Sequence, residues 1–124
     1  MSYYSSFKIS TIGEADLSTE DLLNIFNGHI ADEFIISEKQ KDKIETQNDI
    51  QFREWEFFMK QLSARYSQTL FLIEGHGEER GDIWRAFVRG GKIFYQKAII
   101  TYPDAPQELL LQIEQEIQQQ ILGL

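Results

Sequence analysis

The segment from Thr69 to Pro103, TLFLIEGHGEERGDIWRAFVRGGKIFYQKAIITYP, constrains the fold more than any other part of the chain. Its centre is Gly90-Gly91, flanked by runs rich in β-branched and aromatic residues. Two consecutive glycines take the positive φ angles of a tight hairpin turn without steric cost, so the flanking runs are predicted to pair as antiparallel strands. The run from Leu70 to Ile73 is apolar throughout, which is typical of an interior strand. The segment therefore predicts a three-strand meander from about residue 69 to residue 102.

The same glycine pair predicts which side chains share a face of the hairpin. Counting outward from the turn, Arg89 opposes Lys92 and Phe87 opposes Phe94. Side chains alternate between the two faces of a strand, and this alternation assigns two sets. One face is predicted to carry Arg85, Phe87, Arg89, Lys92, Phe94 and Gln96. The other face is predicted to carry Trp84, Ala86, Val88, Ile93, Tyr95 and Ile99.

Near the N-terminus the sequence predicts one strand and one helix. Apolar and polar residues alternate from Phe7 to Ile12, the pattern of a half-buried strand. Ser18 has the position of a helix N-cap whose hydroxyl accepts a hydrogen bond from the Asp21 amide. A helix is therefore predicted from Thr19 to about Asn27, ending at Asn27-Gly28 because both residues tolerate positive φ.

The middle of the chain predicts a short strand and a second helix. Phe34 to Ile36 suits the strand, and the charged run EKQKDKIE after it is interpreted as an exposed hairpin tip or a loop. Asn48 and Gln51 have the spacing of a capping box, which predicts a helix from there through Tyr66. Apolar residues recur at helical spacing and are expected to pack on the sheet: Trp55, Phe58, Met59, Leu62 and Tyr66.

A last helix is predicted after the two prolines. Asp104 or Ala105 is its expected cap, and Gly123 its expected stop after Leu122. Its apolar seam consists of Leu110, Ile113, Ile117, Ile121 and Leu124, widened by Leu109, Leu111 and Leu122. The width favours packing on the domain, and pairing of this glutamine-rich helix in a homodimer is the alternative.

These elements predict an α+β fold in a single domain over residues 1–124. An antiparallel sheet is expected to be covered on one side by two or three helices, with a ferredoxin-like arrangement as one option for its strand order. A chain of 124 residues is long enough to bury one core without disulfides, and it contains no cysteine. The missing cysteines exclude a thiolate metal site and a cysteine nucleophile.

The net charge of −8 is unevenly distributed. Residues 1–50 carry −6, residues 51–103 carry +2 and residues 104–124 carry −4. An acidic surface repels nucleic acid and anionic membranes, so direct nucleic-acid binding is not expected and any anion site should lie in the middle segment. No run of 18 apolar residues occurs, and the start MSYYSSFKIS lacks the apolar core of a signal peptide. We therefore expect a cytoplasmic protein.

The loop EGHGEERGD gathers the acidic and histidine side chains Glu74, His76, Glu78, Glu79 and Asp82. Such a set has the chemistry for a metal ion or for general acid-base catalysis. Its spacing matches no metal motif, and it leads into a strand rather than into the helix N-terminus that a phosphate cradle needs. We interpret the loop as a solvated connector, with no metal and no cofactor.

A hydrolytic triad has no positive support in the sequence. His29 lies near Asp32 and Glu33, but no serine, threonine or lysine stands in a nucleophile motif that would pair with it. An enzymatic activity is therefore not the favoured interpretation.

The hairpin face with Arg85, Phe87, Arg89, Lys92 and Phe94 is the remaining candidate site. Guanidinium groups beside exposed rings suit a surface that stacks a base or holds an anionic motif. The expectation weighed against this is that a helix covers the two rings and the basic side chains reach out at the edge, because large apolar side chains are usually buried.

The part of the chain from Trp55 to Pro103 resembles small bacterial and phage-encoded α+β proteins of uncharacterised function. Three motifs carry the resemblance. The matching residues are Trp55, Met59, Leu62 and Ser63 in the helix, then Gly75, Gly77, Glu78, Glu79, Gly81, Asp82 and Trp84, then Gly91 and Lys92. The resemblance covers less than half of the chain, and it implies a fold type and a mobile-element origin but no catalytic residue.

The leading functional hypothesis is a non-enzymatic binding or regulatory protein that presents an acidic surface to a protein partner. Combined with the resemblance, it suggests a phage-encoded inhibitor of a host nucleic-acid-handling or defence system, with carboxylates offered where phosphates would dock.

The alternative is a small-ligand or nucleotide-binding protein, enzymes included, that uses the basic hairpin face with His76 as its titrating group. A hollow joining His76 to the arginines, with Phe87 and Phe94 exposed, would favour this alternative. Rings buried beneath the helices would favour the acidic surface.

Overall fold

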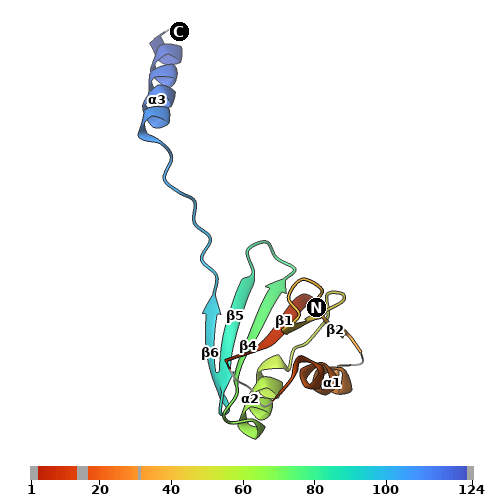
Figure 1. The fold of residues 1–124 in the computed structure, drawn as a ribbon. Helices are drawn as coiled ribbons and strands as arrows, with labels where there is room; N and C mark the ends of the chain where they lie inside the picture. Colours follow the sequence, from red (N-terminus) through yellow and green to blue (C-terminus); the bar gives the residue numbers. More distant parts are fainter. Residues whose placement is uncertain (1–2, 14–16, 31, 123–124) are drawn as a thin grey trace.

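The computed structural model describes residues 3–13, 17–30 and 32–122, and it has an α+β fold. Within these ranges, six strands and three helices follow one another (Figure 1). Their bounds are β1 Ser5–Ile12, α1 Thr19–His29, β2 Phe34–Ile36, β3 Lys43–Thr46, α2 Trp55–Arg65, β4 Leu70–Gly77, β5 Ile83–Arg89, β6 Lys92–Lys97 and α3 Gln107–Leu122. None of the helices in the described ranges is long and apolar enough to cross a membrane.

All six strands belong to one antiparallel sheet with the order β2-β3-β1-β4-β5-β6. The longest pairing joins β1 to β4 over eight residue pairs, which places these two strands at the centre. The order is mixed, because β1 lies between β3 and β4 although α1 and β2 follow it in sequence. The predicted α+β class with an antiparallel sheet is thus confirmed.

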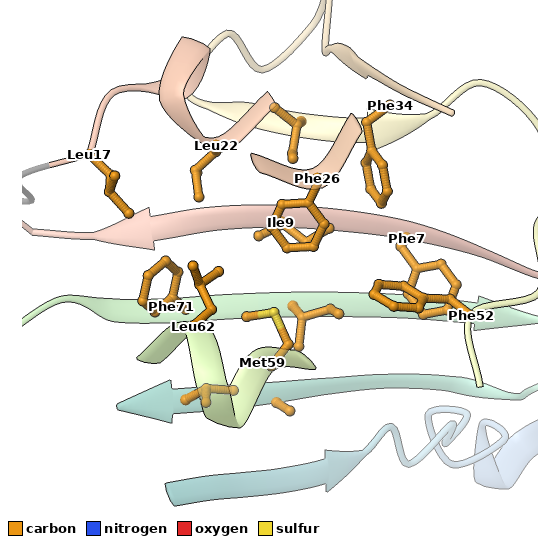
Figure 2. Close-up of a cluster of buried hydrophobic side chains, with 14 of the residues drawn as sticks. Phe7, Ile9, Leu17, Leu22, Phe26, Phe34, Phe52, Met59, Leu62 and Phe71 are labelled. Atoms are coloured by element: carbon orange, nitrogen blue, oxygen red, sulfur yellow. The ribbon is translucent and has the colours of Figure 1, made fainter. Parts of the chain in front are cut away.

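The hydrophobic core lies between one face of the sheet and the helices α1 and α2. Leu22 and Phe26 from α1 and Met59 from α2 are buried over the strands, as Figure 2 shows. The strands contribute alternate residues to the same core: Phe7, Ile9, Phe34, Ile44, Phe71, Ile73, Trp84, Ala86 and Val88. The predicted packing of the α2 stripe on the sheet is confirmed, since Trp55, Phe58 and Tyr66 also contact this cluster.

The register predicted from Gly90-Gly91 is confirmed pair by pair. Both glycines have positive φ, at 56° and 79°, and Arg89 pairs with Lys92 directly beside them. Phe87 pairs with Phe94, so both rings lie on one face. The last strand ends at Lys97 rather than near residue 102, and residues 98–106 have no regular secondary structure.

The first helix has the predicted start but a later end. The Ser18 hydroxyl accepts from the Asp21 amide and the Asp21 carboxylate accepts from the Ser18 amide, each at 3.1 Å. The helix continues to His29, so the predicted stop at Asn27-Gly28 is wrong. The Asn27 side chain is used instead to hold β2, because its amide group bonds both the N–H and the carbonyl of Phe34.

The predicted start of α2 at Asn48 is also wrong. The helix begins at Trp55, and its N-cap Glu54 makes no side-chain capping bond. Residues 48–54 pass along the sheet instead: Ser5 and Ile50 exchange two backbone hydrogen bonds of 2.8 Å. Burial of Ile50 and Phe52 accompanies this pairing, so a long-range contact overrides the local capping motif.

The charged run after β2 is in part a turn and in part a strand. Residues 37–42 form the turn, which fits the interpretation as a hairpin tip, whereas Lys43 to Thr46 pair with β1 as β3. Ile44, the one apolar residue of the run, has no exposed surface and belongs to the core.

The last helix is separated from the rest of the molecule. In Figure 1 the chain leaves β6 as an extended segment and α3 stands apart from the sheet. Residues 98–121 are all exposed. The predicted packing of its wide apolar seam on the domain is therefore wrong, and two helices, not three, cover the sheet. The expected stop at Gly123 and the seam position Leu124 lie outside the described residues.

Candidate functional site

The sheet face opposite α1 and α2 carries no helix among the described residues. We call it the open face. It consists of side chains that alternate with the core residues along each strand: Ile35, Lys43, Glu45, Ser6, Lys8, Ser10, Leu72, Glu74, His76, Arg85, Phe87, Arg89, Lys92, Phe94 and Gln96. Cations outnumber carboxylates on this face, which distinguishes it from the acidic chain as a whole.

The hairpin part of the open face is a platform of cations and rings: Arg85, Phe87, Arg89, Lys92 and Phe94. Arg85 donates from Nε to Gln96 Oε1 at 2.7 Å, and its guanidinium carbon lies 5.2 Å from the centre of the Phe87 ring. Phe94 lies opposite Phe87 on the neighbouring strand and is 63% exposed. A ring this exposed beside a positioned guanidinium is suited to contact an anionic and partly apolar partner.

The expectation that a helix covers the two rings is therefore wrong. The helices pack on the hairpin's other face, where Trp84, Ala86 and Val88 are buried. Both faces of the hairpin contain aromatic residues, so the hairpin sequence alone does not select the covered one. The selection is made through β4, whose buried Phe71 and Ile73 pair with Val88 and Ala86.

A hollow of about 800 Å³ continues from the platform along the sheet. Its lining includes Arg85 and His76 but not Arg89 or Lys92, which lie at the hairpin end of the platform. The charged groups around it are four cations, one carboxylate and His76: Lys8, Lys43, Arg85, Lys97, Glu74 and His76. The hollow is thus a local basic site on a chain of net charge −8.

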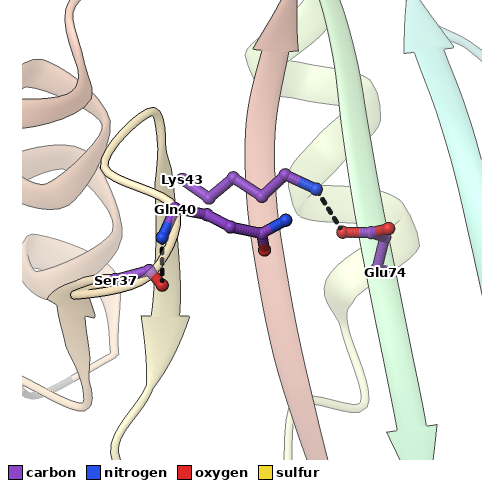
Figure 3. A network of polar contacts seen from close by, with 4 residues as sticks. All are labelled: Ser37, Gln40, Lys43 and Glu74. Atoms are coloured by element: carbon purple, nitrogen blue, oxygen red, sulfur yellow. Dashed lines mark hydrogen bonds and ion pairs between the residues drawn. The ribbon is translucent and has the colours of Figure 1, made fainter.

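One ion pair spans the floor of this hollow. Lys43 reaches from β3 across β1 to Glu74 on β4, with Nζ and Oε2 3.0 Å apart, as Figure 3 shows. Gln40 lies beside it, and its backbone N–H donates to the Ser37 hydroxyl at 3.2 Å. Lys97, another cation of the lining, lies 4.0 Å from an oxygen of Asp82, so Lys8 and Arg85 are the described lining cations outside these two ion pairs.

The acidic loop after β4 is bound to the start of the chain. Tyr3 donates its hydroxyl to Asp82 Oδ2, and the Tyr4 amide donates to Glu78 Oε1 at 2.7 Å. These bonds use two of the carboxylates that the sequence offered as metal ligands. Within the described ranges, no group of three or more His, Cys, Asp or Glu side chains comes together in the geometry of a metal site.

The hydrogen bond to Asp82 raises the pKa of Tyr3 above its usual range. The carboxylate accepts a hydrogen bond from the neutral phenol and would repel a tyrosinate, so the neutral phenol is favoured. Tyr3 is a residue that sequence interpretation missed, because its partner Asp82 lies 79 positions away.

The two histidines lie on different sides of the sheet. His76 is exposed on the open face and lines the hollow. His29 ends α1, where its ring stacks on Phe58 at 4.3 Å between centroids and its Nε2 lies 3.6 Å from Glu54. Its neighbours are thus a ring and a carboxylate on the helix side, far from the platform.

Lys8 and Lys43 are also missed by the sequence interpretation of the site. Lys8 alternates with Phe7 and Ile9 in β1, a signal that places it opposite the core but not beside Arg85. Lys43 belongs to the charged run EKQKDKIE, which the sequence predicts to be a solvated hairpin tip or loop. Only the strand order β3-β1-β4-β5 brings both residues into the same hollow as Glu74 of β4 and Arg85 of β5.

Comparison of the chain with protein-family models, with curated protein sequences and with solved structures finds no match.

Proposed function

We propose that the protein is a non-enzymatic binding protein whose open face holds an acidic, partly apolar segment of a protein partner. The observation that carries the proposal is the platform, where Phe94 is 63% exposed next to Phe87 and Arg85. Single exposed apolar residues are common on surfaces, but two paired rings bordered by three cations form a continuous surface of mixed character.

The chemistry of the platform defines the partner. Arg85, Arg89 and Lys92 attract carboxylates, whereas Phe87 and Phe94 gain free energy when apolar side chains cover them. Guanidinium groups that border rings are frequent in the energetic centres of interfaces. A segment with carboxylates on both sides of an apolar stripe satisfies both demands.

A protein segment suits this surface better than a nucleic acid does. The chain carries −8 overall, and that charge repels a polyanion approaching from a distance. An acidic peptide carries fewer charges and brings apolar side chains that a phosphate backbone lacks. That an acidic surface of the chain inhibits a host nucleic-acid-handling or defence system stays a separate prediction from the net charge and the sequence resemblance.

We further propose that the core of the fold is ferredoxin-like and that β5 and β6 extend it. The first six elements follow the sequence β1-α1-β2-β3-α2-β4, and their strands lie in the order β2-β3-β1-β4. A split β-α-β-β-α-β arrangement with both helices on one face has this pattern. In this proposal the binding platform belongs to the added hairpin.

The binding proposal is tested by NMR titration of the ¹⁵N-labelled chain. The probe is a synthetic helical peptide with leucines at i, i+3, i+4 and i+7 and glutamates on both borders, unrelated in sequence to this protein. We expect it to shift the amide signals of Arg85, Phe87 and Phe94 with saturation. The same peptide with lysines in place of the glutamates should not shift them.

Two charge-reversal variants complete this experiment. Arg85→Glu with Arg89→Glu should weaken peptide binding at least about tenfold, because like charges then face each other. Lys60→Glu with Arg65→Glu reverses two exposed charges on α2, away from the open face, and should leave binding unchanged. Peptide shifts that are absent, or that map to α1 and α2, would contradict the proposal.

A small anionic ligand in the hollow is the second candidate, favoured by Lys8 and Arg85, which line it outside the Lys43–Glu74 and Lys97–Asp82 ion pairs. Inorganic phosphate, nucleotides and a single-stranded oligonucleotide are therefore titrated into the same samples. Saturable shifts centred on Lys8 and His76, together with a raised melting temperature, would assign the hollow to such a ligand instead of to a peptide.

A further inference from the structure

The last helix exposes an apolar surface that no described element covers. Its residues Leu110, Ile113, Ile117 and Ile121 are between 44% and 64% exposed. The linker before it is similar, since Ile99 and Tyr102 are each 87% exposed. Together they form a long apolar surface on an arm that extends away from the sheet (Figure 1). Such a surface on a folded chain indicates a binding partner.

The charge pattern of α3 is opposite to that of the open face. With 3.6 residues per turn, Leu110, Ile113, Ile117 and Ile121 fall on one stripe, while Glu114 and Glu116 border it on its two sides. Residues 98–122 contain four acids and no lysine or arginine. The helix therefore has the chemistry that the platform requires, an apolar stripe between carboxylates.

The length of α3 also matches the length of the strand on which it would pack. Sixteen helical residues span about 24 Å at 1.5 Å per residue. Strand β5 has seven residues and spans about 23 Å at 3.3 Å per residue. A helix lying along β5 and β6 would thus extend over the platform and the neighbouring part of the hollow.

We propose that α3 of one copy of this chain packs on the open face of a second copy, in a reciprocal exchange that forms a homodimer. The proposal rests on the proposed function of the open face and names its partner. Arg85, Arg89 and Lys92 of one copy would face Glu114 and Glu116 of the other. Exchange of an identical element is a low-cost route to a two-fold dimer, because each copy supplies both surfaces.

The linker favours a second copy over the chain's own sheet. Residues 98–106 number nine and can extend about 30 Å. Pro103 and Pro106 restrict the linker, because each proline fixes its own φ and keeps the residue before it extended. An extended linker carries α3 away from its own platform, and two such linkers running side by side would cover Ile99 and Tyr102.

Pairing of α3 with α3 is disfavoured by the same charges. The helix carries Glu108, Glu114 and Glu116 without any basic residue, so two copies would bring carboxylates together with no counter-charge. Its length is only about two heptads, and isolated helices of this length are marginal in water. The basic open face supplies the missing counter-charge, and its rings give the helix an apolar surface to pack on.

Sedimentation equilibrium of three full-length chains tests the proposal. The sheet variant carries Arg85→Glu and Arg89→Glu, and the helix variant carries Glu114→Lys and Glu116→Lys. We expect the mass of two chains for the wild type. Each variant alone should dissociate at least about tenfold more readily, because like charges then face each other in both of its interfaces.

Mixing the two variants is the decisive step. In the mixed dimer the reversed sheet meets the reversed helix and the native sheet meets the native helix, so both interfaces regain opposite charges. Native mass spectrometry should show a dimer with one copy of each variant. Circular dichroism and melting temperature of each variant check that it folds, and Lys60→Glu with Arg65→Glu is the matched control that should dimerise like the wild type.

Three outcomes would overturn the proposal. A wild type that keeps the mass of one chain at the highest concentration reached would leave α3 without a second copy. A sheet variant that dimerises as well as the wild type would indicate α3–α3 pairing. A chain that carries all four reversals and regains the wild-type melting temperature, while the mixture of the two variants forms no dimer, would place α3 on its own sheet.

These results are separable from a failure of the binding proposal. A monomeric chain whose platform still responds to the unrelated acidic peptide would reject the exchange and keep the proposed function. A helix variant whose platform signals do not shift at any peptide concentration would reject the proposed function, because its reversed α3 no longer competes for the platform.

Discussion

At the scale of single residues, Tyr3 holds the acidic loop through a hydrogen bond that requires its phenol to be protonated. Its hydroxyl donates to Asp82, and this bond raises the pKa of the phenol. The folded chain therefore keeps the proton at a pH at which an unfolded tyrosine has begun to lose it. The stability that this bond contributes is complete below the pKa of the unfolded tyrosine and is lost as pH rises through the folded one.

We expect the stability difference between the wild type and Tyr3→Phe to stay constant at neutral pH and to shrink in strongly alkaline solution. Urea unfolding at several pH values measures it, and absorbance at 295 nm reports the tyrosinate directly. The difference in absorbance between the two chains, which reports Tyr3, should titrate above the usual range of tyrosine, near 10. Tyr4→Phe, at an exposed ring, is the control. An absorbance difference that titrates within the usual range would contradict the role of Asp82.

Gly75 is a second residue whose identity depends on a distant side chain. It lies in β4 opposite Trp84, and a Cβ atom added there would overlap the Trp84 ring. That ring is stacked on Trp55, with centroids 4.5 Å apart, and contacts Phe7 edge to face at 6.0 Å. The glycine therefore gives an aromatic stack room to lie flat on the sheet.

We expect Gly75→Ala to destabilise the protein by about 1–3 kcal/mol, the usual cost of overpacking a core. Displacement of Trp84 should change the tryptophan fluorescence and the near-ultraviolet circular dichroism. Gly28→Ala is the matched control, because Gly28 lies in α1 with open space around it, and alanine should stabilise a helix there by about 0.5–1 kcal/mol. An unchanged tryptophan signal in Gly75→Ala would show that the ring accommodates the methyl group.

At the scale of elements, Ser63 connects α2 to the turn of the platform hairpin. Its hydroxyl donates to the Lys60 carbonyl at 3.1 Å and accepts from the Gly91 amide at 2.8 Å. The side chain has no exposed surface. One buried hydroxyl thus fixes the position of the β5–β6 turn relative to the helix.

We expect Ser63→Ala to cost about 1–3 kcal/mol of unfolding free energy, because the Gly91 amide loses its acceptor. Urea unfolding gives the free energy, and hydrogen exchange should show faster exchange at Gly91. Ser67→Ala, at an exposed serine just after the same helix, should change neither quantity. Unaltered exchange at Gly91 would mean that water replaces the serine at no cost.

The two helix starts show why local signals differ in value. The Ser18 cap forms as the sequence predicts, because the Asp21 amide lies only three residues away, and the Asp21 carboxylate completes a capping box by accepting from the Ser18 amide. The similar spacing at Asn48 and Gln51 does not start a helix, because Ile50 pairs with Ser5 and Phe52 enters the core. A capping motif predicts a helix only where the same backbone is not paired with a strand.

At the scale of the whole molecule, charge and apolar surface are divided between two parts. The sheet domain presents a basic open face, and the arm that follows it presents an acidic, apolar helix. The segment sums in the sequence already separate a positive middle from a negative C-terminal part. The structure adds that three cations of this middle segment, Arg85, Arg89 and Lys92, lie on one uncovered face and that α3 is not packed on it.

Local chemistry in the chain was sufficient for the hairpin register, the Ser18 cap and the sharing of one face by Arg85, Phe87 and Phe94. These features depend on neighbours in sequence and on the period of a strand. The covered side of the sheet, the pairing of Ser5 with Ile50 and the meeting of Lys8, Lys43 and Arg85 depend on contacts between distant segments. Strand order settles those contacts, because burial of Phe7, Ile9, Phe71 and Ile73 under α1 and α2 leaves the alternate residues, and with them the platform, facing outward.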